Sequence, residues 1–267
     1  MLKQRIFTAI VLVVIVLTAL FLNDPLYWRA LISIAVLIGF WEWLRFCAVT
    51  DILAKIVSYA LFGSCLYLLQ AGYIAVEIVV YCACALWLLL LLFTMTKVLD
   101  FFHNNVIKLF LGIAVLSSSG WIIIEFKSID YGAWWILCFM ASVWAADVGA
   151  YFVGKRFGKT KLAPQVSPGK TVEGMLGGVA FMLLVYVPVL FYLFNVKAAL
   201  LLLITLVITT IVSVGGDLFE SKMKRYSGLK DSSQILPGHG GVLDRIDSLL
   251  SGAPFFALGL IMLGYIY

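Results

Sequence analysis

Acidic and basic side chains alternate closely between residues 215 and 248. A helix that continues past Asp217 places Lys224 on the same face two turns later, with Glu220 and Ser221 at the turn between them. This grouping fits a site for a divalent metal and phosphate, because Mg²⁺ prefers carboxylate oxygens and cations neutralise the remaining phosphate charge. For individual residues of the segment, an ion-pair network that only stabilises a loop is the alternative.

Further along the same segment, Asp244 and Asp247 lie one helical turn apart. They follow the sequence Pro237-Gly-His239-Gly-Gly, which requires an irregular backbone, since glycine adopts conformations that other residues avoid. His239 could serve as a base, as a ligand or as a hydrogen-bond donor to phosphate, or it could only order the loop.

A second polar region begins at Asp147, inside an apolar stretch. A carboxylate at such a position is costly and is usually paired or functional. Tyr151 and Lys155 follow at helical spacing. Pairing of Asp147 with a lysine for packing is therefore the alternative to a functional role.

The loop after this region carries a helix-start signal at Ser167-Pro168. If a helix starts near Lys170, its free N–H groups and positive dipole would bind phosphate, together with Lys170 and Thr171. A basic loop at the cytoplasmic face would account for the lysine equally well. The sequence Gly169-Lys170-Thr171 is not a P-loop, because Pro164 stands where that motif requires glycine and no strand precedes it.

These residues must be positioned by elements that lie largely in lipid. The chain has 267 residues, of which 64% are hydrophobic and 12% are charged, whereas soluble domains carry about 25% charged residues. The mean hydropathy is +1.09. We therefore expect one all-α polytopic membrane domain over residues 1–267, with helices of little motif content in 1–130 and the catalytic helices and loops in 131–267.

Nine apolar runs are long enough to cross a bilayer as helices. They fall near 6–22, 27–43, 53–71, 74–94, 107–125, 131–153, 175–194, 197–216 and 251–267. The second and ninth runs are short, and the first is interpreted as a retained helix, not a cleaved signal peptide.

The basic residues predict the orientation, because cytoplasmic loops carry an excess of Lys and Arg. With the N-terminus inside, all but three of the 19 basic residues fall on the inner side. The three exceptions are Arg29, Lys127 and Lys197. We expect a multi-pass protein of the inner membrane whose long polar loops, 154–174 and 217–250, face the cytoplasm. The net charge of +5 is explained by this bias, so no nucleic-acid partner is expected.

The stretch from Ser221 to Asp247 resembles the signature of the phosphatidate cytidylyltransferase (CDP-diacylglycerol synthase) family. That pattern begins Ser-x-apolar-Lys-Arg, continues with Lys-Asp and closes with Pro-x-His-Gly-Gly-apolar-x-Asp-Arg-apolar-Asp. The matching positions are Ser221, Met223, Lys224, Arg225, Lys230, Asp231, Ser233, Leu236, Pro237, His239, Gly240, Gly241, Val242, Asp244, Arg245, Ile246 and Asp247.

The family's upstream pattern is also present, from Asp147-x-Gly-Ala-Tyr-Phe through Gly-Lys-x-Lys-Leu-x-Pro to Ser-Pro-x-Lys-Thr-x-Glu-Gly. One departure is Gly169, where lysine is common in the family, so a paired lysine is not required there. The recognisable identity covers about residues 147–252.

The resemblance implies a homodimer that transfers CMP from CTP to phosphatidic acid with Mg²⁺, with K⁺ as a candidate second ion. Asp217 and Asp244 are the metal ligands that it implies, and we expect Asp147 and Asp247 to support them. The remaining expected catalytic residues are Lys224, Arg225 and His239. The expected substrate-binding residues are Ser167, Lys170, Thr171, Glu173, Ser221, Lys230, Asp231 and Arg245.

Functions of other classes make different predictions. A transporter predicts ionisable residues near the midplane of several spans and paired broken helices, whereas the acids here gather at the inner interface. A lipid-binding scaffold has no need of the paired aspartates. A CTP-dependent lipid-alcohol kinase would release CDP in place of pyrophosphate, and the pattern of the CDP-alcohol phosphotransferases is absent.

Overall fold

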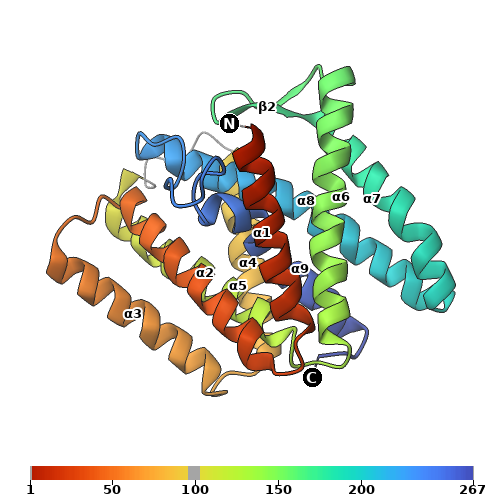
Figure 1. Ribbon diagram of the computed structural model, residues 1–267, viewed down its shortest axis with the longest axis horizontal. Helices are drawn as coiled ribbons and strands as arrows, with labels where there is room; N and C mark the ends of the chain where they lie inside the picture. Colours follow the sequence, from red (N-terminus) through yellow and green to blue (C-terminus); the bar gives the residue numbers. More distant parts are fainter. Residues whose placement is uncertain (1, 96–102, 267) are drawn as a thin grey trace.

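The computed structural model describes residues 2–95 and 103–266. In these ranges the chain forms nine helices and one short antiparallel hairpin (Figure 1). Along the chain, the elements are α1 (Leu2–Phe21), α2 (Pro25–Phe46), α3 (Ile52–Gln70), α4 (Val76–Met95), α5 (Asn105–Glu125), α6 (Gly132–Phe157), β1 (Lys161–Ala163), β2 (Ser167–Thr171), α7 (Val172–Leu193), α8 (Val196–Tyr226) and α9 (Leu243–Met262). The expectation of a helical polytopic membrane protein is confirmed.

Eight of the described helices are long and apolar enough to cross a membrane. The exception is α2, which carries Arg29, Glu42 and Arg45. Successive helices run in opposite directions, so the N-terminus, the β1–β2 hairpin and the 227–242 loop lie at one end of the bundle (Figure 1). We call this the N-terminal end. The C-terminus lies at the opposite end.

Side-chain caps fix where many helices begin. Asp24, Asp51, Asn104 and Asn195 each accept hydrogen bonds from backbone N–H groups of the first turn that follows. Such acceptors satisfy donors that have no partner within the helix. The short polar sequences between apolar runs therefore define both the turns and the helix starts.

Two helices extend beyond the predicted apolar runs, and both extensions lie at the polar motif. The eighth helix continues past residue 216 to Tyr226, in agreement with a helix that runs on past Asp217, and the ninth begins at Leu243, ahead of the run that starts near 251. The hydropathy pattern ended both spans at the first charged residues. The structure keeps these residues helical because their side chains find partners on neighbouring elements, so Asp217 and Asp244 lie on helices, not in a loop.

The seventh helix also begins later than the predicted position near Lys170. Residues 161–171 form the β1–β2 hairpin, with Lys170 on β2 and Thr171 as the N-cap of α7. The Thr171 hydroxyl accepts a hydrogen bond from Gly174 N at 3.1 Å. Lys170 is thus presented by a strand, not by the first turn of a helix.

Helices α8 and α9 approach each other closely at Gly216. A Cβ atom at this position would lie 2.1 Å from Ser251 Oγ. Only glycine permits this approach, which places the start of α9 directly beside the polar turns of α8. The contact thereby brings together two segments that are separated by a long loop.

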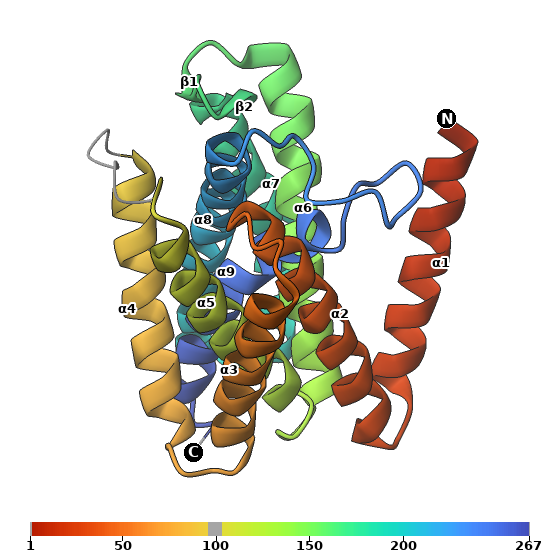
Figure 2. The same ribbon diagram turned by 90° about the vertical axis from the view of Figure 1, so that its left-hand side faces the viewer.

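Helix α1 packs differently from the others. It lies to one side of the bundle, and the 227–242 loop reaches across to its N-terminal turns (Figure 2). There Thr8 Oγ1 donates a hydrogen bond to Pro237 O at 3.1 Å. Most of its exposed residues, including Phe7 and Ile10, are apolar, as expected for a helix surrounded by lipid.

Candidate active site

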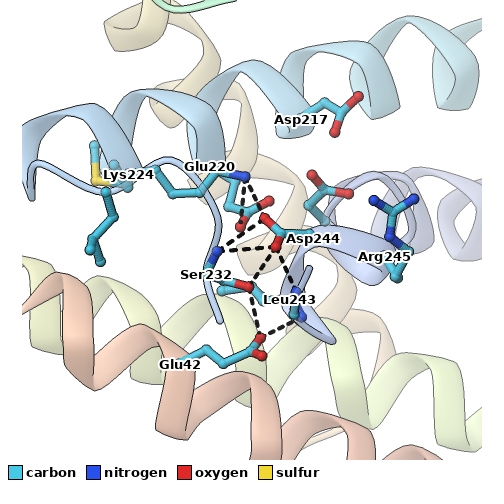
Figure 3. A network of polar contacts seen from close by, with 12 residues as sticks. Glu42, Asp217, Glu220, Lys224, Ser232, Leu243, Asp244 and Arg245 are labelled. Carbon is cyan, nitrogen blue, oxygen red and sulfur yellow. Dashed lines mark hydrogen bonds and ion pairs between the residues drawn. The ribbon is translucent and has the colours of Figure 1, made fainter. Parts of the chain in front are cut away.

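Four carboxyl groups from two helices meet at the N-terminal end of the bundle. Asp217 and Glu220 come from α8, whereas Asp244 and Asp247 come from the first turns of α9. We call these four residues the acidic cluster. The buried Asp247 is close enough to interact electrostatically with both Asp217 and Glu220, so the two helices share one polar site. Figure 3 shows Asp217 and Glu220 on α8 beside Asp244 on α9.

Asp217 faces the hairpin. Lys170 Nζ donates a hydrogen bond to Asp217 Oδ2 and a longer one, of 3.4 Å, to Val214 O. The Lys170 and Asp217 side chains are 28% and 29% exposed. A soluble ligand can therefore reach this side of the acidic cluster.

Asp244 is more enclosed and fully hydrogen-bonded. Its Oδ1 accepts from Lys224 Nζ at 2.6 Å, and its Oδ2 accepts from Ser232 N at 3.0 Å, Ser232 Oγ at 2.9 Å and Gly241 N at 2.8 Å. The Asp244 side chain is only 8% exposed. Its orientation is therefore set by α8 and by the 227–242 loop together.

The backbone geometry of the 227–242 loop requires glycine at position 240. Gly240 has φ +84°, in the left-handed region that other residues rarely adopt, and a Cβ there would lie 2.6 Å from Asp244 Oδ2. Leu236 and Gly240 form an isolated bridge. The tight turn thus brings Gly241 N within bonding distance of the carboxylate.

Two other predicted residues lie near the acidic cluster. Asp147 on α6 is close enough to interact electrostatically with Asp217, Lys170 and Arg245. Arg245 donates from Nε to His239 O at 3.1 Å. His239 Nδ1 is buried and has no hydrogen-bond partner among the described residues.

Several predicted substrate-binding residues serve other contacts or lie apart. Glu173 accepts hydrogen bonds from the backbone N–H groups of Lys159 and Thr160 at 3.0 Å, which anchors the base of the hairpin. Arg225 NH1 donates to Leu229 O at 3.4 Å. The other residues of this group are half-buried Ser167 and Ser221, exposed Lys230 and Asp231, and the helix cap Thr171. Their contact with substrate stays a prediction.

Sequence reasoning missed Ser232 and, on α2, Glu42. Glu42 is fully buried and accepts hydrogen bonds from both Ser232 and Ser233 (Figure 3). The signal that could have found it is a lone acid inside an apolar run, between Trp41 and Trp43.

An apolar cavity of about 370 Å³ lies beside the acidic cluster. It is lined mainly by aliphatic and aromatic side chains of α1, α2, α6 and α9. Its polar lining residues include His239 and Arg245. Because Arg245 follows Asp244 directly in sequence, the cavity and the acidic cluster adjoin at the start of α9.

The donor set of the acidic cluster suits a hard divalent cation. In the described part of the chain, no three acidic, histidine or cysteine side chains already converge as a metal site; lysines contact Asp217 and Asp244 instead. Among the described residues, Lys170 pairs with Asp217, and Lys224 lies beside both Glu220 and Asp244. Neither buried oxygen of Glu220 receives a hydrogen bond from the described residues, and Lys224 Nζ lies 3.4 Å from its Oε1. Carboxylate oxygens are the ligand type that Mg²⁺ prefers.

Comparisons with known proteins agree with the motif. The model of the cytidylyltransferase family matches residues 3–263. A Haemophilus influenzae protein named phosphatidate cytidylyltransferase is 37% identical over 96% of this chain and 98% of its own length. The protein of that name from Pseudomonas aeruginosa is 39% identical over 96% of both chains. The protein of that name from Bacillus subtilis is 48% identical over 49% of each chain.

Proposed function

Because the chain belongs to the cytidylyltransferase family, we propose that it transfers CMP from CTP to phosphatidic acid, which yields CDP-diacylglycerol and pyrophosphate. One observation carries this proposal. Asp244 and Asp247 of the family signature lie on α9 beside Asp217 and Glu220 of α8, with lysines in contact and an apolar cavity next to them at one end of a membrane bundle. A water-soluble nucleotide and a lipid phosphate can meet only at such a boundary.

The reaction depends on neutralising negative charge more than on acid–base catalysis. An anionic phosphate oxygen of phosphatidic acid forms a bond to the α-phosphorus of CTP, while the bond from that phosphorus to the bridging oxygen of pyrophosphate breaks. The nucleophile is already ionised, so no strong base is needed. The barrier comes from bringing two polyanions together and from the charge that develops on the leaving group, and fixed cations lower both contributions.

The acidic cluster is the expected site of Mg²⁺. Asp217 and Asp244 would hold the ion with support from Asp147 and Asp247, and K⁺ is a candidate second ion. When bound, the divalent ion supplies positive charge that neutralises the phosphates and the departing pyrophosphate. The ion pairs of Lys170 with Asp217 and of Lys224 with Asp244 are compatible with metal binding by these aspartates. Both lysine side chains are flexible and can leave their carboxylates to bind phosphate oxygens.

The cations around the acidic cluster are the expected phosphate ligands. Lys170 approaches from the hairpin, Lys224 from α8 and Arg245 from α9. They surround the acidic cluster from three elements, so they can contact several phosphates at once. Arg225, in the last turn of α8, and Lys230, in the 227–242 loop, are exposed and are expected to meet the incoming nucleotide.

The apolar cavity is the expected site for acyl chains of the lipid. Its walls are hydrocarbon side chains, and Arg245 and His239 border it where a phosphate would have to lie. Burying a chain there stabilises the complex by about 0.8 kcal/mol per CH₂ group. This arrangement would hold the lipid phosphate at the edge of the acidic cluster with its tails in the cavity.

We also propose that the protein is a homodimer of the inner membrane with the acidic cluster facing the cytoplasm. The basic residues support this orientation. Lys155, Arg156 and Lys159 flank the hairpin at the N-terminal end, whereas Lys127 and Lys197 lie at the other end. CTP is a cytoplasmic nucleotide, so the open side of the site must face that compartment.

The decisive experiment mixes purified protein with phosphatidic acid, Mg²⁺ and CTP labelled at the α-phosphorus. We expect the label in lipid and pyrophosphate in solution, in equal amounts. Label that remains in CDP, with unlabelled phosphate on the lipid product, would establish transfer of the γ-phosphoryl group and refute the proposal. Protein with Asp217→Asn is the control for contaminating activity.

A further inference from the structure

The carboxylate of Glu42 lies in the interior of the bundle and is 0% exposed. Its Oε1 accepts hydrogen bonds from Ser233 Oγ and from Val242 N at 3.0 Å. Its Oε2 accepts from Ser232 Oγ at 3.0 Å and from Leu243 N at 2.6 Å. All four donors lie at least 190 residues away in the chain, so this contact joins the N-terminal helices to the region of the acidic cluster.

Two of these bonds provide α9 with the cap that its own sequence lacks. The residue at the N-cap position is Val242, which makes no side-chain capping bond. Glu42 instead accepts from the backbone N–H groups of Val242 and Leu243. A carboxylate at a helix N-terminus also interacts favourably with the helix dipole. The direction in which α9 begins therefore depends on a residue of α2.

A third bond connects Glu42 to Asp244 through one serine. Ser232 Oγ lies 3.0 Å from Glu42 Oε2 and 2.9 Å from Asp244 Oδ2, so its single hydroxyl hydrogen is shared between the two carboxylates. Ser232 N also donates to Asp244 Oδ2 at 3.0 Å. Arg45, one turn after Glu42, donates to the carbonyl oxygen of Ser232. Helix α2 thus fixes the side chain and the backbone of the residue that orients Asp244 (Figure 3).

We propose that Glu42 is a positioning residue for the reaction, which orients Asp244 for metal binding through Ser232 and through the first turn of α9. The inference rests on the proposed function, in which Asp244 is a metal ligand. Partners that orient metal ligands in this way typically affect metal affinity or activity about 10- to 100-fold when they are changed. Glu42 never touches substrate, and its effect passes entirely through Ser232 and α9.

The two serines that donate to Glu42 provide a matched pair of variants. Both side chains are buried, with 0% and 4% of Ser232 and Ser233 exposed, and both donate to Glu42. Only Ser232 also contacts Asp244. Ser232→Ala removes the connection to Asp244, whereas Ser233→Ala removes one bond to Glu42 and leaves that connection intact.

Glu42→Gln tests the carboxylate itself. The amide has nearly the same shape, but its NH₂ group faces donors and cannot accept from them. Each oxygen of Glu42 accepts from one serine and from one backbone N–H group of α9. In either orientation of the amide, the NH₂ group therefore opposes one serine and removes one of the two capping bonds. If this variant does not fold, the serine pair still decides the question, because each serine change deletes a single oxygen atom.

Two measurements are made on full-length protein in detergent. The first is the Mg²⁺ concentration that gives half-maximal CMP transfer, with kcat and the KM for CTP at saturating Mg²⁺. The second is the rise in melting temperature that Mg²⁺ causes without substrates. We expect Ser232→Ala and Glu42→Gln to raise the half-maximal Mg²⁺ concentration about 10-fold and to diminish the rise in melting temperature. Ser233→Ala should match the unchanged protein in both.

Equal Mg²⁺ responses of Ser232→Ala and Ser233→Ala would overturn the proposal. So would a Glu42→Gln protein whose activity falls only in proportion to the folded fraction, at an unchanged Mg²⁺ requirement. Failure of the proposed function is recognised separately, since the unchanged protein would then form no CDP-diacylglycerol. In that case the Mg²⁺-dependent melting temperatures of the two serine variants still test the role of Glu42.

Discussion

The contact between α8 and α9 at Gly216 can be tested with one methyl group. In Gly216→Ala, the new Cβ would lie 2.1 Å from Ser251 Oγ and 2.4 Å from Ser251 Cβ. The second distance is about 1 Å shorter than the roughly 3.5 Å at which carbon atoms pack favourably. The Asp247 carbonyl oxygen, also on α9, would lie 3.1 Å from the new Cβ, so the two helices must separate.

The size of the effect follows from this separation. Overpacking of a buried contact costs about 1–3 kcal/mol of stability, which a large helical bundle tolerates. The same shift moves Asp217 relative to Asp247, and a displacement of about 1 Å at a reacting site lowers the rate about 100-fold. We therefore expect Gly216→Ala to insert and fold, with a slightly lower melting temperature and about 1% of the normal CMP transfer.

A second substitution tests whether the clash with Ser251 is what lowers the turnover. Ser251→Gly removes both atoms that the new methyl group would strike, so Gly216→Ala combined with Ser251→Gly should recover most of the turnover. Ser251→Gly alone is the control for the lost serine, whose hydroxyl donates only to Ser248 O. Normal turnover of Gly216→Ala would refute the steric reasoning. A double variant as inactive as the single one would refute it as well.

Three further outcomes are expected. Asp217→Asn should lower CMP transfer at least about 100-fold without loss of folded protein, and near-normal turnover would contradict its assignment as a metal ligand. Leu12→Trp, which fills the apolar cavity from α1, should raise the KM for phosphatidic acid several-fold but not that for CTP; Val14→Trp, on the exposed side of the same helix, should change neither value. Gly240→Ala should lose about 1–3 kcal/mol of stability from backbone strain and also lower turnover, because its Cβ meets Asp244; a melting temperature equal to that of the unchanged protein would show that the loop adapts.

The helical bundle could be predicted because its driving force is local. Eight of the nine described helices are long and apolar enough to cross a membrane, and within lipid a helix is the conformation that satisfies its own backbone hydrogen bonds. The alternation of basic residues then gave the correct order of up and down helices. The caps at Asp24, Asp51 and Asn195 are local signals as well, and they agree with the predicted turns.

The polar helix ends could not be predicted from hydropathy. Lys224 and Asp244 look like loop residues because a charge in lipid is unfavourable when it is considered alone. In the folded chain they pair with each other at 2.6 Å, and this partner, twenty residues away, makes a helical position acceptable for both. Hydropathy averages over neighbours in sequence, so it does not register such a partner.

The sequence by itself predicted the helical membrane bundle and the polar stretches that carry Asp217, Asp244 and the neighbouring lysines, because these follow from composition and from short spacings. Only the tertiary structure decided which of those groups meet. It paired Lys170 of the hairpin with Asp217 of α8. It also brought Glu42, from a segment with no recognisable motif, to the first turn of α9. The physical reason is that hydrogen bonds and ion pairs act over a few ångströms in space, whatever the distance along the chain.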